Sequence, residues 1–147
     1  MKAKRFLYLF SALLAILGGV AYHHFVKRIP ATIHPIVSIV GIYVWVLLLS
    51  SAFLALFPPL EGYRFHFRQL SWVQFGVAVS VFLLELGFVL MYRAGWNLSS
   101  GNLVTGVFIN IILVGLGLLL LREKVNLINV IGIALSIIGV AMISYRP

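Results

Sequence analysis

Five apolar stretches follow one another along this 147-residue chain, at roughly residues 6–25, 33–57, 72–92, 101–121 and 127–145. A helix of about 20 apolar residues crosses the hydrocarbon core of a bilayer. In lipid, a helix also satisfies all of its backbone hydrogen bonds within one segment. The pattern therefore predicts an all-α membrane protein, in which residues 1–147 form a single domain of five transmembrane helices.

The composition excludes a soluble globule and argues against nucleic-acid binding. The chain is 63% hydrophobic and 10% charged, whereas soluble domains are about 45–50% apolar. Its net charge of +8 comes from 11 Lys and Arg residues, but these lie between the apolar stretches or at their ends. Basic residues in such places set membrane topology and contact anionic lipids, so the bilayer is the partner that the charge predicts.

The basic residues also predict how the chain is oriented. An odd number of spans places the two termini on opposite sides of the membrane, and seven Lys and Arg residues fall on the N-terminal side against four on the other. Cytoplasmic loops carry the excess of positive charge. We therefore expect a multi-pass inner-membrane protein with a cytoplasmic N-terminus. The first span resembles a signal peptide in its basic start, but no small-residue cleavage site follows it.

One carboxyl group interrupts the third apolar stretch. Glu85 is one of only three acidic residues in the chain, and an ionisable group at bilayer depth costs about 2.5–3.5 kcal/mol on insertion scales. A low-dielectric site favours the neutral form of a carboxyl group, so Glu85 can serve as a proton or cation site during transport. The alternative is a permanently protonated acid that donates a hydrogen bond to a neighbouring helix, for instance to Asn110.

Polar, aromatic and small residues form a stripe on one face of each of the first four spans. In the third span, Gln74 and Tyr92 lie on one line through Glu85, because a helix turns once in about 3.6 residues. The four stripes predict a common cavity. Its expected substrate or ion contacts are Glu85, Tyr92, Asn110, Trp45, Tyr8 and Thr105, with Arg93 at the mouth. Arg93 would there bind an anionic group; the alternative is a side chain that only reaches for the membrane surface.

Neither an enzyme nor a metal site is expected. The chain has no Cys, and no nucleophile paired with a base, phosphate-binding Gly loop or paired carboxylates appear. His23, His24 and His34 have no acid or thiol nearby in the sequence to complete a metal site. We therefore predict no catalytic residues, no metal and no cofactor.

The last span carries small residues at Gly132, Ser136 and Gly139. Small residues on one helix face allow two helix backbones to approach closely in lipid. Such a seam can pack within one chain or between two chains, and its spacing fits both.

The last two spans carry a resemblance to a known family. Residues 115–125 read GLGLLLLREKV, and residues 131–140 read IGIALSIIGV. This pattern of a helix, a short charged loop with a Glu and a Gly-rich final helix resembles the end of an EamA-type repeat. The same pattern closes the small multidrug resistance proteins, and both groups belong to the drug/metabolite transporter superfamily.

The resemblance implies a transporter built from two such units. Larger relatives carry two five-helix repeats in inverted orientation, as many secondary transporters do. A single repeat is then expected to pair with a copy of itself or with a paralogous small subunit, through the final helix. One departure limits the analogy: small multidrug resistance proteins keep their coupling Glu in the first helix, where this chain has Ala15, Gly18 and Gly19.

From these features we predict a transporter of a small amphipathic metabolite or organic cation, driven by proton or cation coupling. Two alternatives stay open at this point. One is a non-transporting membrane subunit that stabilises or regulates a larger complex. The other is a lipid-carrier flippase subunit, in which Arg64, Arg68 and Arg93 would matter more than Glu85.

Overall fold

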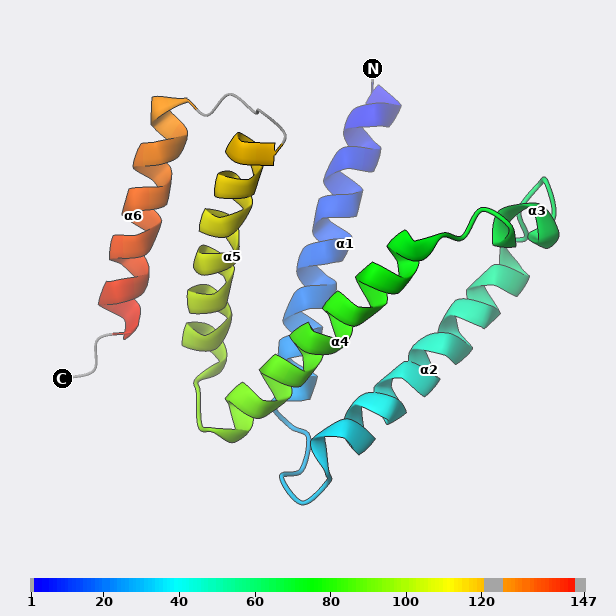
Figure 1. Cartoon of the computed structure of the whole chain (residues 1–147), viewed down its shortest axis with the longest axis horizontal. Helices are drawn as coiled ribbons and strands as arrows, with labels where there is room; N and C mark the ends of the chain where they lie inside the picture. Colours follow the sequence, from blue (N-terminus) through cyan, green and yellow to red (C-terminus); the bar gives the residue numbers. More distant parts are fainter. Residues whose placement is uncertain (1, 121–125, 145–147) are drawn as a thin grey trace. The chain divides into compact units, whose positions relative to one another are not determined.

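The computed structural model describes residues 2–120 and 126–144, which form six α-helices and no strand. The helices are α1 (Lys2–Val26), α2 (Pro35–Leu56), α3 (Tyr63–Phe67), α4 (Trp72–Arg93), α5 (Leu98–Leu120) and α6 (Leu127–Ser144) (Figure 1). The structure therefore has the all-α class that the apolar stretches predict.

Four of these helices are long and apolar enough to cross a bilayer. Their spanning segments are Phe6–Val26, Pro35–Leu56, Trp72–Arg93 and Leu98–Leu120. The apolar part of α6, Ile128–Ile143, is shorter than the other four. The chain is thus a multi-pass membrane protein, and the fifth span in α6 stays a prediction.

The helix ends follow local sequence signals. Pro35 stands in the first turn of α2, where its missing N–H leaves no bond unmade. At the start of α4, the Gln74 side chain accepts hydrogen bonds from the Ser71 backbone N–H (2.8 Å) and hydroxyl (3.2 Å). This pair is a capping box. The sequence predicts Ser71 as the cap of this span, which these bonds confirm, and they place Gln74 at the helix start rather than on a cavity wall.

The sequence predicts Ser99 or Ser100 as the cap of α5, and the structure differs. The helix begins at Leu98, so Ser99 and Ser100 lie inside it and neither is its cap. Asn97 precedes the helix, and its carbonyl accepts the backbone N–H of Gly101 at 2.9 Å. Asn is among the residues preferred at this position, as are the two serines that follow it in the sequence.

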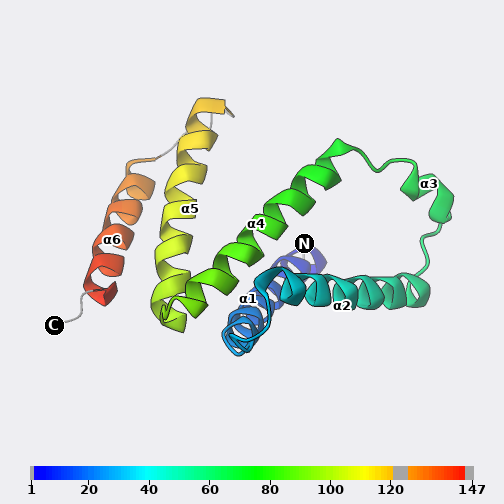
Figure 2. The same ribbon diagram turned by 60° about the horizontal axis from the view of Figure 1, so that its bottom comes forward.

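The short helix α3 was not expected from hydropathy, because it is only five residues long and mixes basic with aromatic side chains. It lies between α2 and α4 in the chain, beyond the end of α2 (Figure 2). The Tyr63 hydroxyl donates a hydrogen bond to the Leu54 carbonyl in the last turn of α2, at 3.3 Å. This bond ties α3 to the helix before it.

The chain divides into two compact units. We call residues 25–93, with α2, α3 and α4, the α2–α4 unit, and the first 24 residues together with the chain from Ala94 onward the α5–α6 unit. In the α5–α6 unit, α5 and α6 run antiparallel side by side (Figures 1 and 2). A side-chain hydrogen bond between His23 and Asn102 joins α1 to α5.

Within the α2–α4 unit, α2 packs against α4. The two most completely buried large side chains are Ile39 on α2 and Val89 on α4, with exposed fractions of 0% and 1%. Ile39 lies four residues after Pro35, and Val89 lies four residues before Arg93. With a rise of about 1.5 Å per residue, the two side chains stand at the same depth from the ends of their helices.

Candidate functional site

Glu85 is the only buried polar or charged residue among those whose side chains the structure describes, with 7% of its surface exposed. Its Oε2 atom is buried and has no hydrogen-bond partner. A buried polar group without a partner carries the full cost of its lost hydration, about 1–3 kcal/mol and more for a charge. The carboxyl group that the sequence singles out is therefore held in an unfavourable place, which is typical of a functional group in a membrane helix.

The face of α4 that carries Glu85 is also the buried face of this helix. Phe88, Val89 and Tyr92 are buried with it, three, four and seven residues further along, which is the spacing of one helix face. The rings of Phe88 and Tyr92 stack with centroids 6.0 Å apart and an interplanar angle of 23°. Two stacked aromatic rings thus lie between Glu85 and the C-terminal end of α4.

Tyr43 on α2 is the residue that the sequence analysis missed. Its hydroxyl oxygen is buried and has no hydrogen-bond partner, and it interacts electrostatically with Glu85. Tyr43 lies eight residues after Pro35, and Glu85 lies eight residues before Arg93. Both therefore stand about 12 Å from the paired ends of their helices. Counting inward from the two ends finds Tyr43 only once the structure shows that these ends lie at the same depth, so no signal in the sequence alone marks it.

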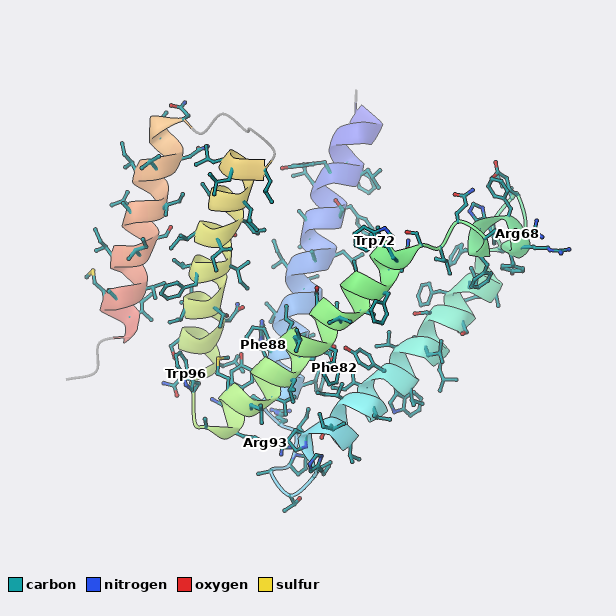
Figure 3. The ribbon with its side chains drawn as sticks, viewed as in Figure 1. Arg68, Trp72, Phe82, Phe88, Arg93 and Trp96 are labelled. Atoms are coloured by element: carbon teal, nitrogen blue, oxygen red, sulfur yellow. The ribbon has the colours of Figure 1, made fainter. Side chains whose placement is uncertain are left out.

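Arg93 joins the two helix ends. Its guanidinium group donates hydrogen bonds to the carbonyls of Ile33 (2.5 Å) and Pro30 (3.4 Å), in the segment that leads into α2. Figure 3 shows Arg93 at the end of α4 beside this segment. Neither sequence alternative, an anion contact or a side chain reaching for the membrane surface, included these bonds. The two hydrogen bonds from Arg93 explain why the start of α2 and the end of α4 lie at the same height.

Lys27 lies at the same end of the α2–α4 unit. Its Nζ atom is 6.0 Å from the centroid of the Tyr92 ring, within the range of a cation–π interaction. Tyr92, an expected substrate contact, is therefore packed between Phe88 and Lys27. It closes the site on the side of the helix ends.

The remaining expected contacts have different surroundings. Trp45 and Tyr8 are exposed, at 68% and 73%. The Thr105 hydroxyl donates to the Gly101 carbonyl on its own helix at 2.9 Å, and the Ser136 hydroxyl does the same to Gly132 at 2.8 Å. Such bonds satisfy a hydroxyl locally, which distinguishes these two residues from the unpartnered Glu85 and Tyr43.

A groove of about 360 Å³ lies between α5 and α6. It brings together three residues that the sequence analysis selected, Asn110, Gly132 and Ser136, and adds Asn129 from the start of α6. Gly139 is half-buried and does not line the groove. Asn110 is exposed, so its amide group is available to a partner outside the helix pair. Within residues 2–120 and 126–144, no group of His, Asp and Glu side chains could hold a metal ion.

Comparison with known proteins identifies the family of this helical membrane chain. The model of the EamA-like transporter family matches residues 6–145. The chain belongs to the EamA-like transporter family. Membership makes it a membrane transporter of the drug/metabolite type, in agreement with the resemblance carried by the last two helices. No curated protein and no solved structure matches the chain.

Proposed function

We propose that this EamA-like chain is a secondary transporter that moves a small amphipathic metabolite or organic cation across the inner membrane, with Glu85 as its proton or cation site. The buried, unpartnered carboxyl group of Glu85 is the observation that carries the proposal. Two basic side chains of the α2–α4 unit are engaged elsewhere, Lys27 with Tyr92 and Arg93 with two backbone carbonyls. The counter-charge of an ionised Glu85 would then come from outside the chain, as a proton or a cation.

The transporter would act as a pair of chains of this kind. EamA-like transport is expected to need two five-helix repeats, and this chain supplies one, with α6 as its fifth span and the N-terminus in the cytoplasm. The groove between α5 and α6 supports a pairing surface, because it exposes the Asn110 amide in the middle of a spanning helix. Polar side chains that hydrogen-bond across helices stabilise association in lipid. A second copy or a paralogous small subunit would provide the missing half.

The decisive experiment measures proton movement in proteoliposomes loaded with a pH-sensitive dye, when a panel of small organic cations is added. Protein-free liposomes give the baseline for passive entry of each cation. We expect the wild-type protein to move protons in response to at least one cation and Glu85→Gln to lose this response. Glu61→Gln is the matched control, because Glu61 is an exposed acid in the connection between α2 and α3.

A response that survives in Glu85→Gln would remove the coupling role from Glu85. A wild-type chain that shows no uptake alone, yet becomes stable only with another co-expressed membrane protein, would contradict transport by a pair of copies. That outcome would instead support a non-transporting subunit.

A further inference from the structure

Two buried oxygen atoms in the α2–α4 unit both lack a hydrogen-bond partner. Glu85 Oε2 and the Tyr43 hydroxyl are both buried without a hydrogen-bond partner, and they lie on neighbouring helices that pack together. They interact electrostatically but make no hydrogen bond with each other. A small group that donates a hydrogen bond to each would satisfy both atoms at once.

The depth of the pair fixes which side chains surround such a group. Glu85 and Tyr43 each stand about 12 Å from the helix ends joined by Arg93, and Ile39 and Val89 lie between them and those ends. Phe88 is buried one turn from Glu85. The surroundings of the two oxygens are therefore apolar and aromatic, which suits the hydrocarbon part of an amphipathic molecule.

The chemistry of the pair favours an ammonium group over a bare metal ion. Hard metal cations take about six or more oxygen ligands, and this pair offers two side chains. Ser38 carries a third buried, unpartnered oxygen, but it lies five residues before Tyr43, about 7.5 Å along the helix axis. An ammonium group needs fewer acceptors, and its charge matches the carboxylate.

We propose that Glu85 and Tyr43 together bind the ammonium group of a primary or secondary amine, which donates one N–H to the Glu85 carboxylate and another to the Tyr43 oxygen. This inference rests on the proposed transport function and names its substrate class. Two N–H groups are required to reach both oxygens. A quaternary ammonium with the same hydrocarbon part would meet the charge of Glu85 but leave Tyr43 without a hydrogen-bond partner.

The test compares two probes that share one hydrocarbon part and one positive charge, phenethylammonium, which has three N–H groups, and its N,N,N-trimethyl analogue, in which methyl groups replace them. Binding of each to the purified full-length protein is measured by isothermal titration calorimetry in detergent. A hydrogen bond to a charged group contributes enough for about a tenfold change in affinity. We expect Tyr43→Phe to weaken binding of phenethylammonium about tenfold and to change binding of the trimethyl analogue less than about twofold.

Two further variants complete the design. Tyr63→Phe is the matched control, since Tyr63 lies on α3 and its hydroxyl bonds a backbone carbonyl; it should change neither affinity. Glu85→Gln should weaken binding of both probes. If Tyr43→Phe cannot be purified in a folded form, the test is the ratio of the two affinities in the wild-type protein. Equal affinity for the two probes would overturn the inference.

The outcomes separate this inference from the proposed function. If Glu85→Gln abolishes the proton response while Tyr43→Phe leaves the ratio of the two affinities unchanged, amine recognition by Tyr43 is wrong and transport through Glu85 stands. If Tyr43→Phe weakens both probes equally, the N–H bridge is also wrong. If Glu85→Gln changes neither binding nor proton movement, both proposals fail together.

Discussion

Arg93, at the C-terminal end of α4, donates a hydrogen bond to the Ile33 carbonyl just ahead of α2. This bond brings the ends of two antiparallel helices to the same level. Residues counted the same number of positions inward from the two ends then lie at equal depth, as Ile39 and Val89 do, and as Tyr43 and Glu85 do. The Arg93 side chain thus helps to hold α2 and α4 at the relative height along their axes that places Tyr43 and Glu85 at the same depth.

Replacing Arg93 should loosen this arrangement of α2 and α4. Arg93→Gln shortens the side chain and removes the charged donor to Ile33 and Pro30, and hydrogen bonds from a charged group contribute about 1.5–3 kcal/mol. We expect a loss of stability of that order, measured as a lower midpoint of thermal unfolding in detergent. Arg68→Gln, at an exposed arginine directly after α3 (Figure 3), should leave the midpoint unchanged. An equal fall in both variants would contradict the anchoring role.

Removing the Glu85 carboxyl group should stabilise the protein while it abolishes transport. Met has a similar length and no polar group to bury, so Glu85→Met removes the cost of the unpartnered Oε2, about 1–3 kcal/mol. Functional sites commonly trade stability for activity in this way. The measurement is the free energy of unfolding in a denaturing detergent, together with the proteoliposome assay. A less stable Glu85→Met protein would mean that the carboxyl group holds the helices together.

The capping box at the start of α4 predicts a purely structural role for Gln74. Ser71→Ala and Gln74→Ala should each lower stability by about 1 kcal/mol, because each leaves first-turn backbone groups without a partner. Gln74→Glu keeps the acceptor and should be neutral. Thermal unfolding of the three variants tests this, and substrate uptake should stay at the wild-type level in all of them. A transport defect in Gln74→Ala without loss of stability would restore Gln74 to the cavity.

Two glycines, one inside α4 and one in the turn that follows it, should respond in opposite directions to the same substitution. Gly95, in the turn after α4, has a φ of 91°, a conformation that costs other residues about 1–2 kcal/mol. Gly87 lies inside α4, and an added Cβ would meet no atom within 4 Å. Gly95→Ala should therefore destabilise the protein, while Gly87→Ala should stabilise it by about 0.5–1 kcal/mol. Unfolding midpoints that move in the same direction would contradict this assignment.

The groove between α5 and α6 makes a prediction about assembly. An added Cβ at Gly132 meets no atom within 4 Å in the single chain, so Gly132→Ala should leave the α5–α6 pair undisturbed and is the small-residue control for Gly132→Leu. We expect Gly132→Leu to weaken pairing between copies, since a large side chain prevents the close approach of two helices. Cross-linking of purified protein in proteoliposomes measures the dimer fraction. Gly87→Leu is the matched control, and an unchanged dimer fraction in Gly132→Leu would remove the groove from the interface.

The helices themselves could be predicted from the sequence because the physical requirement is local. Backbone groups in lipid must bond within their own segment, so long apolar stretches such as Trp72–Arg93 and Leu98–Leu120 become helices wherever they lie in the fold. Their ends are also local, as at Ser71 and Pro35. The start of α5 was less certain, because Asn97 and two serines compete for one cap position. The family likewise followed from the pattern in the last two helices.

The sequence by itself also determined that Glu85 is exceptional, since a carboxyl group in an apolar helix is costly whatever surrounds it. Only the tertiary structure decided what lies beside it. Tyr43 is one aromatic residue among many in an apolar helix, and nothing in its immediate sequence marks it. Its relation to Glu85 depends on the segment before α2 and on the bonds from Arg93 that hold the two helix ends level. Residues 42 positions apart come to the same depth on neighbouring helices because of that long-range contact, which helix periodicity cannot encode.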